Sequence, residues 1–311
     1  MRVLRTPDER FDDLSGYPFS PHYVDVPAGD DDPAGEPTIR LHHVDEGPAG
    51  AAETVVLLHG EPSWSYLYRT MVPPLVAAGH RVVAPDLVGF GRSDKPAART
   101  DYTYARHVEW VRSALFDRLD LSGITLFGQD WGGLVGLRLV AEHPDRFRRV
   151  VVANTGLPTG EEKVADAFTQ WQRFSQDAPA LPVGAIVNAG TVGDLPPDVV
   201  AAYDAPFPDE TYKEGARQFP LLVPTTPDDP GGVDNRRAWD ALASFDRPFL
   251  CAFSDGDPIT RGADRRFREL VPGAAGQDHV TIAGGGHFLQ EDKGPELAAV
   301  VLSFVAGTAA D

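Results

Sequence analysis

Uninterrupted apolar blocks alternate with helical patterns along most of this chain. The blocks occupy residues 53–58, 80–86, 124–128, 147–154, 248–253 and 279–283. Continuous apolar runs of this kind are typical of strands that are buried on both faces of a sheet. Helical patterns lie between the blocks at 66–78, at 104–119 and from Leu134 onward, and a last one covers 295–305. Strands that alternate with helices predict a mostly parallel sheet with helices on both faces.

The beginning of the chain follows a different pattern. Residues 22–26 and 38–44 give two strands before the first buried block, and the polar loop 27–33 between them has the composition of a solvent-exposed turn. We expect these two strands to form an antiparallel edge of the same sheet.

Residues 156–229 interrupt the alternation. This segment contains no clear buried strand, and its helical stretches are separated by many prolines. An insertion of this kind in an α/β sheet is most simply a helical lid. We therefore expect a first part of the sheet domain at 1–156, a helical cap at 157–228 and the second part of the sheet domain at 229–311.

The composition narrows the class of protein. With 311 residues, 42% of them hydrophobic, the chain has ample apolar material for a packed core. Its formal net charge of -18 argues against nucleic acid or an anionic membrane as a partner. No stretch reaches the ~18 apolar residues of a membrane span, and the first residues lack the apolar core of a signal peptide. We expect a cytoplasmic monomer whose single cysteine, Cys251, is a buried structural thiol.

The block at 124–128 ends in the sequence Gly128-Gln129-Asp130-Trp131-Gly132. A strand, a sharp turn and a helix in this order form a nucleophile elbow, whose usual pattern G-x-S-x-G places a serine at the tip. Here the tip is Asp130, and a carboxyl group with an ordinary pKa of about 3.9 is already an anion at neutral pH. The alternative is that Asp130 only caps the following helix, because aspartate is a favoured capping residue.

Four motifs in register resemble one enzyme family. They are His59-Gly60-Glu61-Pro62-Ser63-Trp64, the glycine-punctuated loop 86–96, Asp130-Trp131-Gly132-Gly133 and Gly286-His287-Phe288. In order and context they are similar to those of the haloalkane dehalogenases of the α/β-hydrolase superfamily, in particular the subfamily whose catalytic acid follows the seventh strand. The resemblance covers nearly the whole chain. It implies an eight-stranded α/β-hydrolase fold with an inserted cap, and hydrolysis of the carbon–halogen bond of haloalkanes.

The base follows from chain order, because in α/β-hydrolases the nucleophile comes first, the acid second and the histidine last. His287 follows a C-terminal strand within a glycine run and is the candidate base. The other histidines at strand ends or on the surface are interpreted as structural: His59 as a hydrogen-bonding partner, and His42, His43 and His143 as surface or edge-strand residues.

The turn after residues 248–253 offers two candidate acids, Asp255 and Asp257. Alignment of Ala252 with the strand end of the family favours Asp257, which leaves Asp255 as a turn former. Asn154 occupies the strand end at which another dehalogenase subfamily carries its acid, and its neutral side chain also favours Asp257.

Displacement of a halide requires a group that holds the departing anion. Two converging indole N–H groups supply donors without charge. Trp131, directly after the nucleophile, is the first candidate. Trp171 matches the lid tryptophan of the family and is the second, with the alternative that it only fills the interface between lid and core. Trp64, Trp110 and Trp239 are interpreted as packing residues.

The resemblance implies a two-step reaction that uses no metal and no organic cofactor, with a small halogenated molecule and a halide ion as the partners. Asp130 attacks the halogen-bearing carbon and forms an alkyl ester while the two tryptophans take the halide. His287, oriented by Asp257, then activates a water that attacks the ester. Backbone N–H groups of Glu61 and Trp131 hold the resulting oxyanion.

Two other functions stay open. An epoxide hydrolase shares the elbow aspartate, the His-Gly-x-Pro turn and the histidine, but it needs two lid tyrosines, and Tyr203 and Tyr212 lie in the expected lid. Their surroundings match a dehalogenase lid segment, so this function ranks second. A ligand-binding α/β-hydrolase that has lost catalysis predicts a broken triad, whereas every position is filled here, and it ranks last.

Overall fold

The computed structural model describes residues 1–29 and 38–308. Of the loop expected at 27–33, residues 30–33 therefore lie outside the described part of the chain. Within the two described ranges, none of the helices has the length and hydropathy of a membrane span.

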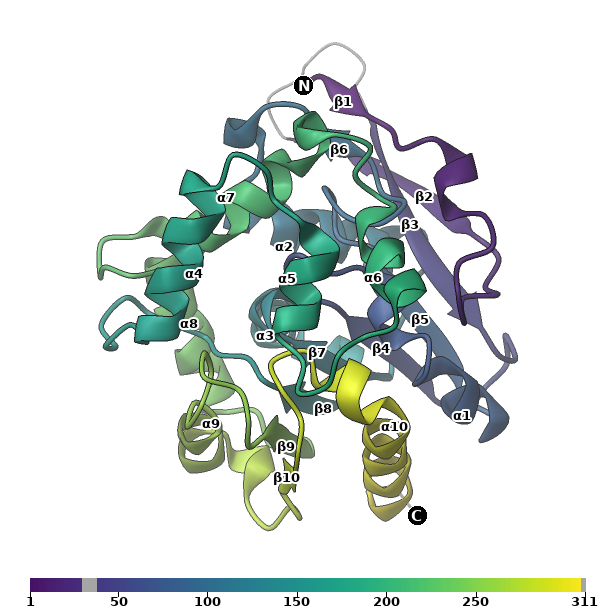
Figure 1. Ribbon diagram of the computed structural model, residues 1–311. Coiled ribbons are helices and arrows are strands. Elements are labelled where there is room, and N and C mark those ends of the chain that lie inside the picture. The colour runs from purple at the N-terminus through teal and green to yellow at the C-terminus, as the bar shows by residue number, and fades with distance from the viewer. Residues whose placement is uncertain (30–37, 309–311) are drawn as a thin grey trace.

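One eight-stranded sheet forms the centre of the molecule, with the strand order β10-β9-β8-β7-β4-β5-β3-β2 (Figure 1). Neighbouring strands are parallel except for the pairs β2–β3 and β3–β5. The predicted mostly parallel sheet with an antiparallel edge is therefore confirmed. The bounds of its strands are β2 His22–Pro27, β3 Thr38–Glu46, β4 Thr54–Leu58, β5 Arg81–Pro85, β7 Ile124–Gln129, β8 Phe147–Ala153, β9 Phe249–Ser254 and β10 Val280–Ile282. A separate antiparallel pair joins β1 Val3–Leu4 to β6 Lys95–Pro96.

The register of the parallel strands aligns their carboxyl ends. Leu58 of β4 pairs with Gly128 of β7, and Gln129 pairs with Ala153 of β8. The loops that follow β4, β7, β8 and β9 therefore open on the same edge of the sheet. This edge is where open α/β sheets bind their ligands.

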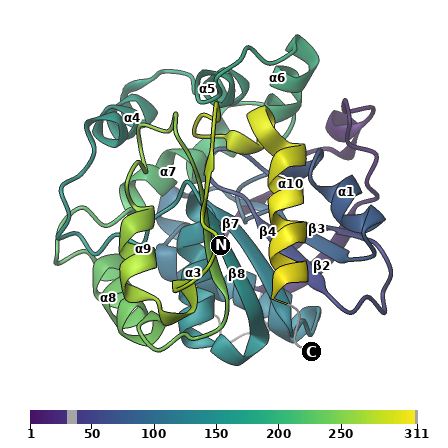
Figure 2. The same ribbon diagram turned by 90° about the horizontal axis from the view of Figure 1, so that it is seen from below.

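Helices cover both sides of the sheet. Contacts join α1 to α10, and α3 to both α2 and α8. Figure 2 shows these two groups on opposite sides of the strands. The bounds of the helices outside residues 157–228 are α1 Val72–Ala77, α2 Tyr104–Arg112, α3 Trp131–Glu142, α8 Pro230–Leu242, α9 Asp264–Leu270 and α10 Leu289–Gly307.

Four further helices lie in the segment 157–228: α4 Asp166–Asp177, α5 Val183–Ala189, α6 Pro197–Asp204 and α7 Glu214–Leu222. This segment, all of which the structure describes, contains no strand. In Figure 2, α4, α5 and α6 lie together beyond one end of the sheet. They extend over the edge at which the loops after β4 and β7 open.

Four helix boundaries differ from the sequence prediction. The pattern at 66–78 splits into a 3₁₀ turn, Ser65–Tyr68, and α1, because two prolines occupy the first turn of α1, where their missing N–H groups cost nothing. The pattern at 104–119 continues from α2 into a π-helical stretch, Ser113–Arg118. The third helix begins at Trp131 and not at Leu134. The last helix begins at Leu289 and not at Pro295, since one extra turn joins it across the non-helical Lys293.

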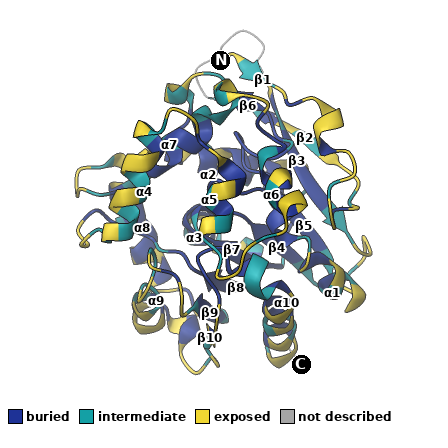
Figure 3. Cartoon of the chain, viewed as in Figure 1, coloured by how far each residue is buried: buried dark blue, intermediate teal, exposed yellow. Residues whose placement is uncertain are grey.

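Burial follows the predicted blocks. In Figure 3 the strands and the inner faces of the helices are dark blue, while the outer faces of the helices are exposed. Strand β7 is buried along its whole length. Cys251 is buried and unpaired, as expected, and burial raises the pKa of its thiol to about 12.

Candidate active site

The tip of the turn between β7 and α3 is Asp130. Its backbone has φ 50 and ψ -127, a conformation that L-residues rarely adopt and that proteins retain at functional positions. Asp130 does occupy the N-cap position of α3, but its side chain makes no capping hydrogen bond. The carboxylate is therefore free of the structural task that the N-cap alternative assigned to it.

Two glycines make room for this tip. A Cβ atom on Gly60 would lie 2.2 Å from Oδ1 of Asp130, and one on Gly132 would lie 1.9 Å from the carbonyl oxygen of Leu58. Neither position can carry a side chain without moving the loop after β4 away from the elbow. The glycines of the two sequence motifs are thus required by the close approach of these two loops.

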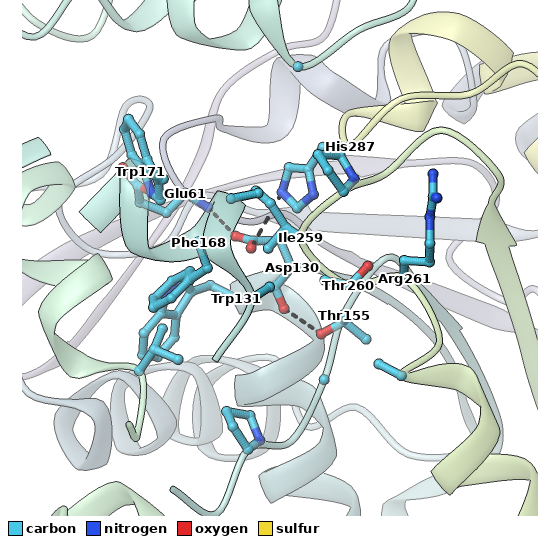
Figure 4. Close-up of a pocket in the computed structure, with 18 of the residues that line it drawn as sticks. Glu61, Asp130, Trp131, Thr155, Phe168, Trp171, Ile259, Thr260, Arg261 and His287 are labelled. Atoms are coloured by element: carbon cyan, nitrogen blue, oxygen red, sulfur yellow. Dashed lines mark hydrogen bonds and ion pairs between the residues drawn. The ribbon is translucent and has the colours of Figure 1, made fainter. Parts of the chain in front are cut away.

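Groups from three different strand ends hold Asp130, two at its carboxylate and one at its backbone (Figure 4). The backbone N–H of Glu61 donates to its Oδ1 at 2.8 Å, and Nε2 of His287 lies 3.5 Å from its Oδ2. The hydroxyl of Thr155 donates to its backbone carbonyl at 2.7 Å. Sequence reasoning missed Thr155, whose only signal was its place two residues after the end of β8.

His287 lies between two carboxylates. Its Nδ1 is 3.1 Å from Oδ2 of Asp257, on the side opposite to Asp130. Burial alone would lower the pKa of His287, but the charges and hydrogen bonds of Asp257 and Asp130 outweigh it and raise the pKa to about 10. The imidazole is therefore protonated at neutral pH, beside an ionised Asp257.

The two candidate acids have different surroundings. Asp257 is 1% exposed, and it accepts hydrogen bonds from the backbone N–H of Ile259 at 2.8 Å and from the N–H and hydroxyl of Thr260. Burial acts to raise its pKa, but His287 and these donors lower it to about 2. Asp255 is exposed and accepts from the N–H of Gly284, so it does not approach the histidine. The structure brings Asp257 to His287 and leaves Asp255 outside.

The loop that carries His287 is fixed to the sheet by amide and hydroxyl groups. Asn154, fully buried, donates to the carbonyl oxygens of Gly286 at 2.8 Å and His287 at 3.1 Å. Gln129 donates to the carbonyl of His287 at 3.1 Å, and Ser254 donates to that of Gly286 at 2.8 Å. The sequence identified Asn154 only as a neutral residue at a strand end, and its contacts show that it anchors the histidine loop.

A cavity of about 1200 Å³ opens above Asp130. Its lining is mostly apolar and includes both predicted halide-binding residues, Trp131 and Trp171. Trp131 is buried and packs edge-on against Phe219, whereas Trp171 is half-buried on α4. Figure 4 shows the two indoles on the same side of the Asp130 carboxylate as Phe168.

The side chain of Glu61 also borders this cavity, which the sequence analysis did not anticipate. Burial, together with the charge of Asp130, raises the pKa of this carboxyl well above its usual range, and a hydrogen bond from Trp171 opposes the shift in part. Burial therefore favours the uncharged form of Glu61 beside Asp130.

Of the histidines interpreted as structural, two lie deeper than predicted. His59 fits the structural interpretation, since its Nδ1 lies 2.9 Å from the Gly60 carbonyl and its Nε2 accepts from the N–H of Leu87 at 2.9 Å. The prediction that His42 and His43 are surface or edge residues is wrong, because both are buried on β3, the second strand from the edge. His42 is held there by Asp86 at 2.7 Å.

The other tryptophans pack as predicted. Trp64 and Trp110 are buried, and their indole N–H groups donate to the backbone carbonyls of Ala202 and Ala28. Trp239 donates to the carbonyl of Leu157 but also borders the cavity.

The lid tyrosines do not face the cavity. Tyr203 is fully buried and its hydroxyl is bonded to Glu291, and neither Tyr203 nor Tyr212 belongs to the cavity lining. An epoxide hydrolase would need both hydroxyls beside the nucleophile, and this arrangement does not provide them.

Comparison with known proteins agrees with this geometry. The model of the alpha/beta hydrolase fold family matches residues 53–294. The haloalkane dehalogenase of Psychrobacter cryohalolentis is 58% identical over 305 residues, which covers 98% of each chain. Haloalkane dehalogenase 1 of Mycobacterium tuberculosis is 58% identical over 308 residues, covering 99% of this chain and 100% of that protein.

A solved structure is also similar over nearly the full length. The tetrameric haloalkane dehalogenase DpaA from Paraglaciecola agarilytica has a TM-score of 0.88 and 38% sequence identity, and the match covers 97% of this chain and 98% of that chain. None of these relatives favours the epoxide hydrolase. Fold, site and relatives agree: this chain belongs to the haloalkane dehalogenases of the α/β-hydrolase superfamily.

Proposed function

We propose that the protein hydrolyses the carbon–halogen bond of small haloalkanes to give an alcohol, a halide ion and a proton. The observation that carries this proposal is the carboxylate of Asp130, which borders an apolar cavity and makes no capping hydrogen bond. Nε2 of His287 lies 3.5 Å from its Oδ2. An apolar cavity suits an alkyl chain, and a carboxylate anion attacks saturated carbon without prior deprotonation.

In the first step Asp130 attacks the halogen-bearing carbon from behind, and the carbon–halogen bond breaks as the ester bond forms. The electron pair of the broken bond leaves with the halide. The indole N–H groups of Trp131 and Trp171 stabilise this anion, since both side chains border the cavity. Burial of Glu61 favours its uncharged form, which reduces the repulsion between its carboxyl group and the halide.

In the second step His287 takes a proton from a water that attacks the carbonyl carbon of the ester. Asp257 holds Nδ1 of the imidazole at 3.1 Å and stabilises the imidazolium that forms. The backbone N–H of Glu61, already 2.8 Å from Oδ1 of Asp130, stabilises the oxyanion together with that of Trp131. The intermediate then collapses: the alkoxide takes the proton held by His287 and leaves as the alcohol, and the carboxyl group of Asp130 loses its remaining proton, which is the proton released overall.

The organisation of the chain fits this reaction. We assign residues 157–228 to a cap that closes the cavity over the sheet domain of 1–156 and 229–311, because α4 and α5 contribute residues such as Trp171 and Ile186 to the lining. The cap excludes water from the first step. The cytoplasmic location and the monomeric state expected from the sequence stay predictions.

The test is halide release. The native protein is expected to release bromide from 1-bromobutane and from 1,2-dibromoethane, whereas Asp130→Ala releases none above the uncatalysed rate. Styrene oxide is the comparison substrate, and no diol is expected from it. Bromide release by Asp130→Ala at the native rate, or diol formation without bromide release, would overturn the proposal.

A further inference from the structure

One carboxylate joins the loop of the catalytic histidine to the cap. We call residues 284–288 the histidine loop and residues 190–193 the cap loop. In the first turn of α10, Oδ1 of Asp292 accepts from the N–H of Val192 at 3.0 Å, and its Oδ2 accepts from the N–H of Gly286 at 2.8 Å. Figure 1 shows the start of α10 beside the end of α5, where the cap loop begins. The two loops belong to segments that are about a hundred residues apart in the chain, and Asp292 is their shared acceptor.

The two loops also fit each other closely. The N–H of Phe288 donates to the carbonyl oxygen of Gly190 at 3.2 Å. A Cβ atom on Gly286 would lie 2.4 Å from that same oxygen, and one on Gly190 would lie 2.6 Å from the ring of Phe288. Because no space separates the backbones, a shift of the cap loop moves the histidine loop.

The peptide groups beside His287 are thereby fixed from two directions. On the sheet side, the carbonyl of Gly286 accepts from Asn154 and Ser254. On the cap side, its N–H donates to Asp292. Among the described residues, Asp292 is the only one of these three partners that also forms hydrogen bonds with the cap loop.

The cap loop in turn borders the substrate cavity. Gly190, Thr191 and Val192 all belong to its lining. A substrate that displaces the cap loop therefore moves Val192, whose N–H group donates to Asp292.

The neighbouring carboxylate has a different set of contacts. Glu291 is paired with Arg69 at 2.5 Å and with the hydroxyl of Tyr203, so it ties the start of α10 to the core and to α6. Within the described part of the chain, its side chain forms no hydrogen bond with the histidine loop. Glu291 thus serves as a matched comparison for Asp292.

We propose that Asp292 is a positioning residue that sets the placement of His287 according to the position of the cap loop, and thereby controls hydrolysis of the alkyl ester. This rests on the function proposed above. Alkylation needs only Asp130 and the halide site, whereas hydrolysis needs His287 within reach of a water. When Asp292→Asn replaces the carboxylate by an amide, only one of the two oxygen positions keeps an acceptor. The NH₂ group at the other position then faces the N–H donors of the cap loop or that of Gly286.

The experiment separates the two steps. Native protein and Asp292→Asn are mixed with 1-bromobutane and quenched with acid over time, and intact mass gives the fraction that carries one butyl group. The variant is expected to alkylate at the native rate and to hydrolyse the ester roughly 10-fold or more slowly, so that the butyl-enzyme accumulates after a burst of bromide.

Two variants serve as controls. Asp209→Asn changes an exposed cap carboxylate that accepts from the N–H of Thr211 far from the histidine loop, and it is expected to match the native protein. Glu291→Gln is expected to lower the melting temperature without accumulation of butyl-enzyme. An Asp292→Asn variant with no accumulation, or one that loses both steps equally, would overturn the proposal, as would accumulation in Glu291→Gln.

A second measurement uses the native protein alone, so it does not require that any variant folds. Amide hydrogen exchange of the native protein is expected to show Val192 and Gly286 protected together and released together when the reaction product 1-butanol is added at high concentration. Fast exchange at Val192 beside a protected Gly286 would contradict the coupling. A native protein that releases no bromide would overturn the proposed function and this role with it, whereas bromide release with an unchanged Asp292→Asn variant would overturn this role alone.

Discussion

At the scale of single residues, the position of His287 between two carboxylates bears on how the two steps of the proposed reaction are separated. Asp130 and Asp257 together raise its pKa to about 10, so the free enzyme holds an imidazolium. Alkylation of Asp130 removes one of these two negative charges, and the pKa of His287 falls. In the proposed reaction the histidine can then release its proton and act as a base once the ester has formed.

The surroundings of the two candidate acids lead to a first mutational prediction. Asp257→Asn is expected to lower kcat for 1-bromobutane by roughly 10²- to 10⁴-fold, because an amide does not stabilise the imidazolium. Asp255→Asn, an exposed position, is expected to stay within about 2-fold of the native kcat. Steady-state bromide release measures both, with circular dichroism as the check on folding. An equal loss in the two variants would show that the acid is misassigned.

The sequence predicted those residues of the candidate site that stand in short local motifs, and it missed those that do not. Asp130 and His287 stand in short glycine patterns whose spacing has a direct steric reason, as the contacts of Gly60 and Gly132 show. Thr155 carries no motif, because its partner Asp130 lies in another strand–loop unit. The pairing of Asp292 with both Val192 and Gly286 likewise arises only from the tertiary arrangement.

At the scale of elements, strands were easier to predict than helices. Every strand of the central sheet lies within an expected block or differs from it by a few residues, because a strand buried on both faces needs a continuous apolar run. Helix ends depend on contacts from outside the helix. The extra turn at Leu289–Asp292 forms because Glu291 and Asp292 have partners in the core and the cap, and Pro295 conceals it in the sequence.

At the scale of the whole molecule, several histidines are buried in neutral form. His107 is fully buried against the rings of Tyr102, Trp110 and Phe219, and neither of its ring nitrogens has a hydrogen-bond partner among the described residues. Burial lowers its pKa to about 3, and burial lowers that of His43 to about 4. Such groups make the stability of the fold depend on pH.

The sign of this dependence follows from proton uptake. Below pH 6.5 the unfolded chain protonates His107, whereas the folded protein does not do so until about pH 3, so the free energy of unfolding falls as the pH is lowered through this window. For one such histidine the loss between pH 7 and pH 4 is on the order of 3 kcal/mol. His107→Leu is expected to reduce the fall of the melting temperature over this range, whereas the exposed His22→Asn is not. Identical pH profiles for the native protein and His107→Leu would contradict the account.

The most direct test of the central claim is the intact mass of His287→Ala after incubation with 1-bromobutane. We expect a stable adduct of one butyl group on the peptide that contains Asp130, a single equivalent of bromide from the variant, and continuous bromide release by the native protein. Continuous bromide release by His287→Ala with no adduct would contradict the division of work between Asp130 and His287.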